Sequence, residues 1–190
     1  MRLTKSRRGK LVILVFILFV LVIVATQSGW LRKGGPLAAS QPGFYNVAYF
    51  IDGDTIVIDM NGHQETVRFI GVDTPETHKP NTPVQCYGPQ AAAYTKKLIG
   101  AQRVRLQADP LDTNRDRYGR LLRYIYLSDG SLVDEILIQK GYGFAYLGFP
   151  LERADQFALD QKIAKSAKLG LWGSCSPSVN QYGGYTSNAL

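Results

Sequence analysis

The sequence predicts an α+β fold in which five strands form a small, partly open barrel and about three helices pack around it. Two observations support this prediction. Short runs that alternate apolar and polar residues, as half-buried strands do, are separated by Gly, Asn and Asp turns. Longer runs with an apolar face at helical spacing lie between and after these strands and end at glycine. A length of 190 residues allows one such domain with appended segments.

The first three strands are predicted to form a meander. They are expected at residues 45–51, 55–60 and 64–72. Asp52 and Gly53 separate the first two strands. Asn61 and Gly62, a dipeptide that favours tight hairpins, separate the second strand from the third. Three strands in succession, joined by turns this short, form a meander.

The second half of the domain mixes strands and helices. Strands are expected at residues 102–108 and 118–127, and helices at residues 90–99, 132–140 and 151–168. Pro89 suits the start of the first helix and Gly100 its end. The resulting order of three strands, one helix, two strands and two helices matches an OB-type barrel with added helices.

Charge is distributed unevenly along the chain, which has a formal net charge of +7. Residues 1–33 contain seven Lys and Arg and no Asp or Glu, and the other 15 of the 22 basic residues balance 15 acidic ones. The positive charge therefore belongs to the N-terminal segment. It is not evidence that the domain binds a polyanion.

The N-terminal segment has the pattern of a signal anchor. A basic cluster precedes an uninterrupted apolar run from Leu11 to Ala25, and no convincing cleavage site follows. We expect residues 1–30 to form a basic N-terminus and one transmembrane helix that hold the domain on the extracytoplasmic side of the cell membrane. The alternative is a cleaved signal peptide and a secreted protein. Beyond this segment we expect a flexible linker, the barrel domain and a flexible polar tail at residues 31–43, 44–175 and 176–190.

Residues 68–76 concentrate charged groups at the end of the third predicted strand. Asp73 follows an apolar run, and Pro75 ends the strand because proline has no N–H and a fixed φ. A second acidic turn, containing Asp54, lies upstream, and Arg120 lies downstream. Together these stretches supply several carboxylates and two arginines.

Such a set of groups suits the hydrolysis of a phosphodiester. Carboxylate and carbonyl oxygens bind hard cations such as Ca²⁺, and arginine binds phosphate through a planar pair of donors. The candidate metal ligands are Asp54, Asp73 and the Thr74 carbonyl. The candidate catalytic residues are Glu76, as general base, and Arg68 and Arg120, as cations that hold the phosphate. Each motif alone is also typical of an ordinary turn or a solvated strand face.

The sequence resembles the staphylococcal nuclease (thermonuclease) family from about Val47 to Trp172. The motifs that carry the resemblance come in the family's order at near-family spacing: Ile51–Thr55, Arg68–Glu76, Tyr87–Pro89, Tyr94–Lys97, Asp116–Arg120 and Tyr124–Tyr126. The resemblance implies an OB-fold and Ca²⁺-dependent hydrolysis of DNA and RNA to 3′-phosphorylated products.

The resemblance also assigns roles to individual residues. It implies calcium binding by Asp54, Asp73 and Thr74, catalysis by Arg68, Glu76 and Arg120, and nucleotide contacts by Tyr118 and Tyr146. At Gly148 the staphylococcal enzyme has a second tyrosine, a departure that bears on base stacking and not on the chemistry. We expect a monomer that takes DNA and RNA as substrate, prefers single strands and contacts the membrane through its N-terminal helix.

The chain has two cysteines, Cys86 and Cys175. The staphylococcal enzyme lacks both, whereas related exported nucleases resemble this chain in carrying such a pair. An even number of cysteines in an exported chain predicts a disulfide between them, and two free thiols are the alternative.

Three functions are consistent with this pattern. A calcium-dependent nuclease is favoured because all of the family's catalytic carboxylates and arginines are present. An OB barrel that binds single strands or protein tails without cleaving them is the second possibility. A tethered scaffold that interacts through its tail is the third, and nothing in the sequence positively supports it.

Overall fold

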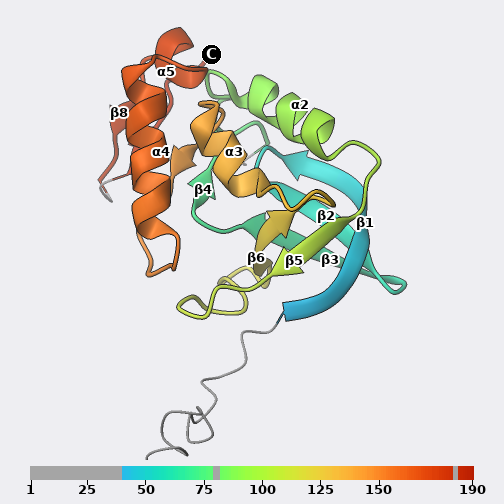
Figure 1. Ribbon diagram of the computed structural model, residues 1–190. Helices are drawn as coiled ribbons and strands as arrows, with labels where there is room; N and C mark the ends of the chain where they lie inside the picture. The colour runs from blue at the N-terminus through green and yellow to red at the C-terminus, as the bar shows by residue number, and fades with distance from the viewer. Residues whose placement is uncertain (1–39, 79–81, 182–183) are drawn as a thin grey trace, which may run out of the picture. The chain divides into compact units, whose positions relative to one another are not determined.

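Five strands close into a barrel in the order β1-β2-β3-β6-β5 in the computed structural model (Figure 1). Their bounds are β1 Ser40–Asp52, β2 Thr55–Met60, β3 His63–Phe69, β5 Val104–Gln107 and β6 Leu121–Tyr126. β3 and β6 pair in parallel, and the other neighbours pair antiparallel. This confirms the five-stranded barrel predicted from the sequence, except that the pairing of β1 with β5 closes it.

The structure describes residues 40–78, 82–181 and 184–190. The predicted transmembrane signal anchor at residues 1–30 and most of the predicted linker lie outside this range. Among the described residues, no helix is both long and apolar enough to cross a membrane.

β1 is the strand that closes the barrel, because it pairs with β2 along its second half and with β5 along its first. Irregularities in its ladders allow the strand to bend between the two partners. It begins at Ser40, opposite Gln107, four residues before the domain boundary predicted at Phe44. The sequence around Gly43 has the composition of a linker, and only its pairing with a distant strand makes it part of the barrel.

Three longer helices and one single-turn helix accompany the barrel within the described residues. They are α2 Gly88–Ile99, α3 Val133–Gln139, α4 Ala154–Ser166 and α5 Leu171–Ser174. Figure 1 shows α3 between α2 and α4. The three longer helices agree with the sequence prediction to within three residues at either end. Pro89 and Gly100 mark the two ends of α2, and Gly141 follows the end of α3.

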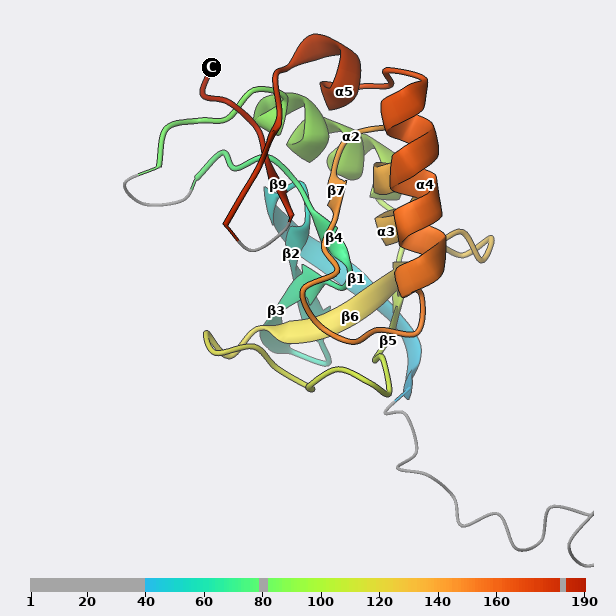
Figure 2. The same ribbon diagram turned by 90° about the vertical axis from the view of Figure 1, so that its left-hand side faces the viewer.

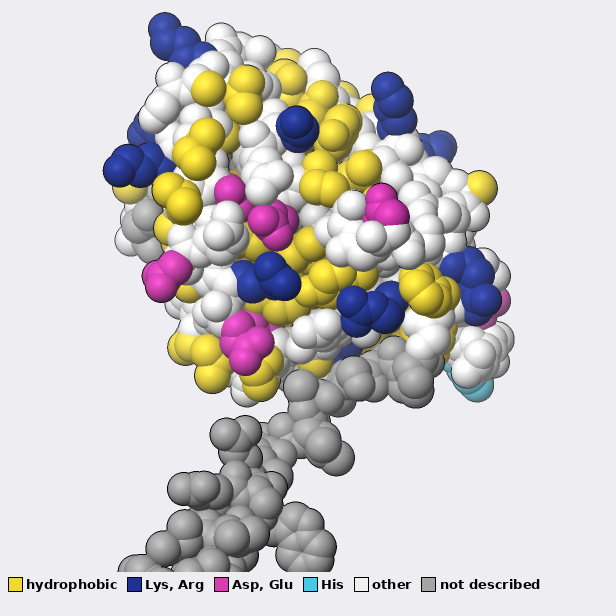
Figure 3. Space-filling model, viewed as in Figure 1, with side chains coloured by type: hydrophobic (Ala, Val, Ile, Leu, Met, Phe, Trp, Pro, Cys, Tyr) yellow, Lys and Arg dark blue, Asp and Glu magenta, His cyan; other side chains and the backbone are white. Residues whose placement is uncertain are grey.

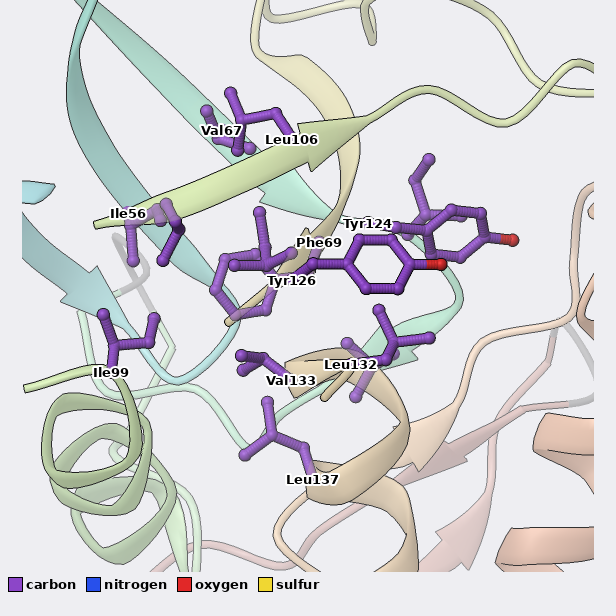
Figure 4. Packing of buried hydrophobic residues seen from close by; sticks show 14 of the residues in the cluster. Ile56, Val67, Phe69, Ile99, Leu106, Tyr124, Tyr126, Leu132, Val133 and Leu137 are labelled. Carbon is purple, nitrogen blue, oxygen red and sulfur yellow. The ribbon is translucent and has the colours of Figure 1, made fainter. Parts of the chain in front are cut away.

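The core lies inside the barrel and under α3. Val133 and Leu137 of α3 point toward aromatic and aliphatic side chains of the barrel strands, and Ile99 of α2 lies at the edge of the same cluster (Figure 4). Val133, Leu137 and Ile99 are fully buried. Burial of each such side chain stabilises the fold by about 1.5–3 kcal/mol.

A short ladder beside the barrel carries the candidate site. β4 (Val72–Asp73) pairs with β7 (Phe144–Ala145) immediately after the chain leaves β3. Gly71 makes this change of direction possible, because its φ is +71° and a Cβ there would lie 2.6 Å from the ring of Phe157. Only glycine fits this position without displacing Phe157.

The C-terminal segment differs from the flexible tail predicted at residues 176–190. It forms a hairpin of β8 (Ser178–Val179) and β9 (Tyr185–Thr186). The ring of Tyr185 lies 5.0 Å from that of Trp172 and 5.8 Å from that of Phe144. The polar composition concealed this packing, because the aromatic partners of Tyr185 come from β7 and α5.

A buried carboxyl group lies between α3 and the barrel. Asp134 has no exposed surface; its Oδ2 accepts a hydrogen bond from the Ile125 N–H at 2.9 Å, and its Oδ1 has no hydrogen-bond partner in the structure. Burial raises the pKa of Asp134 to about 8. The side chain is therefore protonated at neutral pH in the folded protein.

The raised pKa of Asp134 predicts that stability falls with increasing pH. Between the ordinary value of 3.8 and about 8, the folded carboxyl keeps its proton while the unfolded one has lost it, so a rise in pH favours unfolding. This single group contributes a slope of up to about 1.4 kcal/mol per pH unit in that window. Asp134→Asn keeps the oxygen acceptor for Ile125 and removes this slope, which urea unfolding at pH 5 and pH 8 would measure. Identical pH dependence in the two proteins would contradict the assignment.

Candidate active site

Asp54 connects the β1–β2 turn to the segment that follows β4. Its Oδ2 accepts hydrogen bonds from the Thr74 N–H at 2.7 Å and the Thr74 hydroxyl at 3.0 Å, and its Oδ1 accepts one from the Thr55 hydroxyl at 2.9 Å. The backbone oxygen of Asp54 accepts a hydrogen bond from the Phe69 N–H at the end of β3. Two of the three predicted metal ligands, Asp54 and Thr74, are thereby brought together across 20 residues of chain.

Arg68 joins the third predicted ligand to this pair. Its Nη2 lies 3.2 Å from Asp54 Oδ2 and 2.7 Å from Asp73 Oδ1. Its Nη1 donates to the backbone oxygens of Phe69 at 3.0 Å and Val72 at 2.6 Å. The guanidinium is thus held from both sides, with only 13% of the side chain exposed.

The charges around Arg68 define one electrostatic cluster. Burial alone would lower the pKa of Arg68, but the carboxylates of Asp54, Asp73 and Glu76 outweigh it and raise that pKa above its usual value. Tyr146 contributes to the same increase. Four residues that sequence analysis singled out, Arg68, Asp54, Asp73 and Glu76, therefore lie within electrostatic reach of one another.

Glu76 lies half-buried on the loop after β4, and Gln85 holds its backbone on both sides. The Glu76 N–H donates to Gln85 Oε1 at 2.9 Å, and the Gln85 N–H donates to the Glu76 oxygen at 2.9 Å. Gly88 packs closely from α2, because a Cβ there would lie 2.9 Å from the Glu76 backbone oxygen. The backbone of Glu76 is consequently fixed although the residue belongs to a loop.

Asp52 is a site residue to which sequence analysis assigned no role beyond a turn. It is 7% exposed, and its Oδ1 accepts hydrogen bonds from the Gly53 N–H at 2.9 Å and the Thr77 hydroxyl at 3.0 Å. The Thr77 N–H lies 3.3 Å from Oδ2. Burial and the neighbouring charge of Asp54 raise the pKa of Asp52. The sequence feature that could have indicated a role for Asp52 is its position in the same turn as Asp54.

Arg120 lies immediately before β6 on a separate loop. Its Nε donates to Asp116 Oδ2 at 2.7 Å, and its backbone N–H donates to Asp116 Oδ1 at 3.0 Å. Although burial opposes it, this pairing lowers the pKa of Asp116. Arg68 on β3 lies opposite Leu122 on the parallel strand β6, two residues after Arg120. Arg120 therefore precedes the strand that pairs with the strand carrying Arg68.

The two predicted nucleotide-contacting tyrosines are on the surface. Tyr118 is 69% exposed, and its hydroxyl accepts a hydrogen bond from Arg117 Nη2 at 2.7 Å. The Tyr146 N–H donates to the Gly71 oxygen at 2.8 Å, which places Tyr146 beside β4. Gly148 leaves space next to the Tyr146 ring, and the exposed Phe149 has its ring centroid 6.0 Å from that ring. Phe149 thus supplies an aromatic surface where Gly148 lacks one.

The predicted calcium ligands are oxygen donors from Asp54, Asp73 and Thr74. Among the described residues, no group of three or more His, Cys, Asp and Glu side chains is arranged to hold a metal ion. The predicted ligand set differs from such a group, because it consists of two carboxylates and one backbone carbonyl. Oxygens of Asp54 and Asp73 already converge on one positively charged nitrogen of Arg68. Oxygen donors that converge in this way fit Ca²⁺ with water or substrate oxygens completing its coordination.

Cys86 and Cys175 form a disulfide with a Cα–Cα distance of 5.9 Å. It joins the residue two positions before α2 to the residue that follows α5. The bond therefore fixes one end of the loop that carries Glu76 to the C-terminal part of the chain.

This combination of barrel, short ladder and charged cluster agrees with comparisons to known proteins. Residues 66–174 match the family model described as Staphylococcal nuclease homologue. The chain belongs to this family.

Individual relatives extend the similarity over most of the chain. It is 38% identical to a thermonuclease of Staphylococcus hyicus over 174 residues, which cover 90% of this chain and 99% of that protein. It is 42% identical to the endonuclease YncB of Bacillus subtilis (strain 168) over 154 residues, covering 79% of this chain and 72% of the relative. A thermonuclease of Staphylococcus intermedius is 38% identical over 162 residues, covering 82% and 94%.

The contacts of Asp52 predict that it stabilises the loop on the C-terminal side of Glu76. Asp52→Ala leaves the N–H groups of Gly53 and Thr77 without their acceptor and should lower the free energy of unfolding by about 1–3 kcal/mol. Amide hydrogen exchange at Thr77 should become faster. Asp59→Ala is the matched control, because Asp59 accepts the Gly62 N–H in an exposed turn where water can replace it. Equal losses for the two variants would contradict the role of Asp52.

Proposed function

We propose that this chain is a Ca²⁺-dependent nuclease that hydrolyses DNA and RNA to 3′-phosphorylated products. The observation that carries the proposal is the cluster in which Arg68 holds Asp54 and Asp73 together with Glu76 nearby. The naming of the relatives as thermonucleases and endonucleases supports it. A binding module without activity is less consistent, because every catalytic residue of the family's pattern is present.

In the proposed reaction, water attacks phosphorus and the bond from phosphorus to O5′ breaks. The phosphate remains on the 3′ oxygen, and O5′ takes a proton from solvent to become a hydroxyl group. Glu76 accepts the proton of the attacking water. Arg68 and Arg120 hold the non-bridging oxygens as negative charge grows on them. Bound Ca²⁺, held by Asp54, Asp73 and the Thr74 carbonyl, would neutralise phosphate charge and make water more acidic.

The structure adds one requirement to the role of Arg68. The N–H groups of Nη1 and Nη2 face protein oxygens, including Asp73 Oδ1 at 2.7 Å. For a phosphate oxygen to bind Nη2, the Asp73 carboxylate must therefore first give up its hydrogen bond to Nη2. The Asp73 side chain is 39% exposed, so water can solvate its carboxylate while the phosphate replaces it as a partner of Arg68.

The face of the domain shown in Figure 3 does not form a single basic platform. On the face shown in Figure 3, Lys and Arg side chains are scattered among Asp and Glu. This agrees with the balanced charge of residues 34–190. We therefore expect the contacts with nucleic acid to be local to the site and to involve few phosphates.

We also propose that the chain is anchored in the cell membrane with the nuclease domain outside the cytoplasm. The support is the basic cluster and the apolar run from Leu11 to Ala25.

Chelation is expected to abolish cleavage of denatured DNA, and added Ca²⁺ to restore it, whereas Mg²⁺ should support cleavage poorly because it requires smaller octahedral sites. Ca²⁺ should also raise the melting temperature, since a ligand of the folded state stabilises that state. Asp54→Asn and Asp73→Asn should each reduce this shift. Full activity in chelator would refute the metal assignment.

Glu76→Gln is expected to lower kcat by about 10²–10⁴-fold, because it removes the general base while keeping the size of the side chain. Arg120→Lys should also lower kcat strongly, because a single ammonium replaces the planar pair of donors. Glu152→Gln and Arg103→Lys are the matched controls, since both residues are exposed. Steady-state cleavage of a single-stranded oligonucleotide measures the effect, and a near-normal kcat in either variant would contradict that residue's role.

Membrane anchoring predicts that the full chain sediments with membranes and that protease added to intact cells removes the domain. Mature protein in the medium with an N-terminus between Gln27 and Gly43 would show a cleaved signal instead. That result would leave the proposed nuclease activity intact.

A further inference from the structure

The last residues of the chain lie against the loop that carries Glu76. The Cys86 N–H donates to the Asn188 oxygen at 2.7 Å, and the Leu190 N–H donates to the Val84 oxygen at 2.9 Å. Between these bonds, Gln85 and Ala189 form an antiparallel bridge. Figure 2 shows the C-terminal segment beside the loop before α2. Residues 187–190, named here the C-terminal strap, thus act as a short added strand.

Gln85 connects the strap to Glu76. One side of Gln85 faces Ala189, and its N–H and side-chain oxygen bond to the backbone of Glu76 at 2.9 Å each. Glu76, Gln85 and Ala189 therefore lie side by side across three segments of the chain. Displacement of the strap would remove the neighbour of Gln85 on one side, and the position of Glu76 depends on Gln85.

The strap is itself attached to the folded domain at several points. Ser187 is 4% exposed, and its hydroxyl donates to the Cys86 oxygen at 2.9 Å. The Ser176 N–H donates to Asn188 Oδ1 at 2.8 Å, next to the disulfide at Cys175. Tyr185, two residues earlier, packs on Trp172 and receives a hydrogen bond from Lys165. Because the strap is fixed to the domain by these contacts, its hydrogen bonds to residues 84–86 restrain the loop.

We propose that the C-terminal strap is a positioning element of the active site, which holds Gln85 against Glu76 and so keeps the general base in place. The inference rests on the proposed nuclease function. Glu76 activates water and does not bind the phosphate, so loss of the strap acts on kcat and leaves KM nearly unchanged. No residue of the strap belongs to the hydrophobic core cluster, and the disulfide joins two residues outside the strap, so we expect the fold to persist without it.

Removal of residues 187–190 from the full chain tests the proposal. We expect kcat for a single-stranded oligonucleotide to fall about 10–100-fold, as small misplacements of catalytic groups do, with KM within about twofold. In the Glu76→Gln background the same removal should cause no further loss, because no base remains to be positioned. Unchanged kcat, or an equal loss in both backgrounds, would overturn the proposal.

Point variants guard against a general effect of the truncation. Leu190→Pro removes the N–H that bonds to Val84 and should lower kcat, whereas Leu190→Ala keeps this N–H and should not, since the Leu190 side chain is 74% exposed. Equal activities of these two variants would count against the strap.

Amide hydrogen exchange provides a readout that does not depend on activity. Removal of residues 187–190 should accelerate exchange at Glu76 and Gln85 while exchange in the barrel core stays unchanged. If the intact protein cleaves no nucleic acid, the proposed function fails, and exchange at these two amides still decides whether the strap orders the loop. Unaltered exchange would overturn the proposal in either case.

Discussion

The buried guanidinium of Arg68 is the interaction on which the arrangement of the site depends. Transfer of a charge from water into a protein costs several kcal/mol, and partners must offset this cost. Here Asp54 and Asp73 offset it, and two backbone oxygens at the β3–β4 bend accept the remaining donors. Loss of one partner of such a group typically costs about 3–5 kcal/mol. The same requirement that keeps Arg68 satisfied therefore keeps two acidic side chains close together, despite their repulsion.

The residues of this site come from both the barrel strands and the loops. β3 carries Arg68, and its parallel pairing with β6 brings the start of β6, which follows Arg120, beside it. Glu76, in contrast, lies on a loop, and its position depends on hydrogen bonds from outside the barrel. Thr74 is bound by Asp54 and Thr77 by Asp52, so the two acids of one turn hold the loop on either side of Glu76. Hydrogen bonds on both sides of Glu76 therefore restrain its backbone although it lies on a loop.

The C-terminal segment adds a second set of hydrogen bonds to the loop that carries Glu76. A polar stretch with few apolar residues would not fold alone, because it buries too little surface to offset its loss of conformational entropy. Tyr185 offsets part of this loss of entropy by packing on Trp172 and Phe144. The disulfide fixes Cys175 to Cys86, so only the residues after Cys175 remain to be ordered. The C-terminal segment is therefore ordered by its contacts with the domain, and it in turn forms backbone hydrogen bonds to the loop before α2.

The sequence by itself determined what local patterns specify: the strands of the meander, the ends of α2 at proline and glycine, and, through family motifs, Arg68, Glu76 and Arg120 as candidate catalytic residues. The tertiary structure alone decided the closure of the barrel from Ser40, the role of Asp52, the buried state of Asp134 and the order of residues 184–190. Each of these features depends on a partner distant in the chain, whereas periodicity and turn composition report only on neighbouring residues. A polar residue has the same local signature in solvent and beside a distant partner, and only the folded chain distinguishes the two.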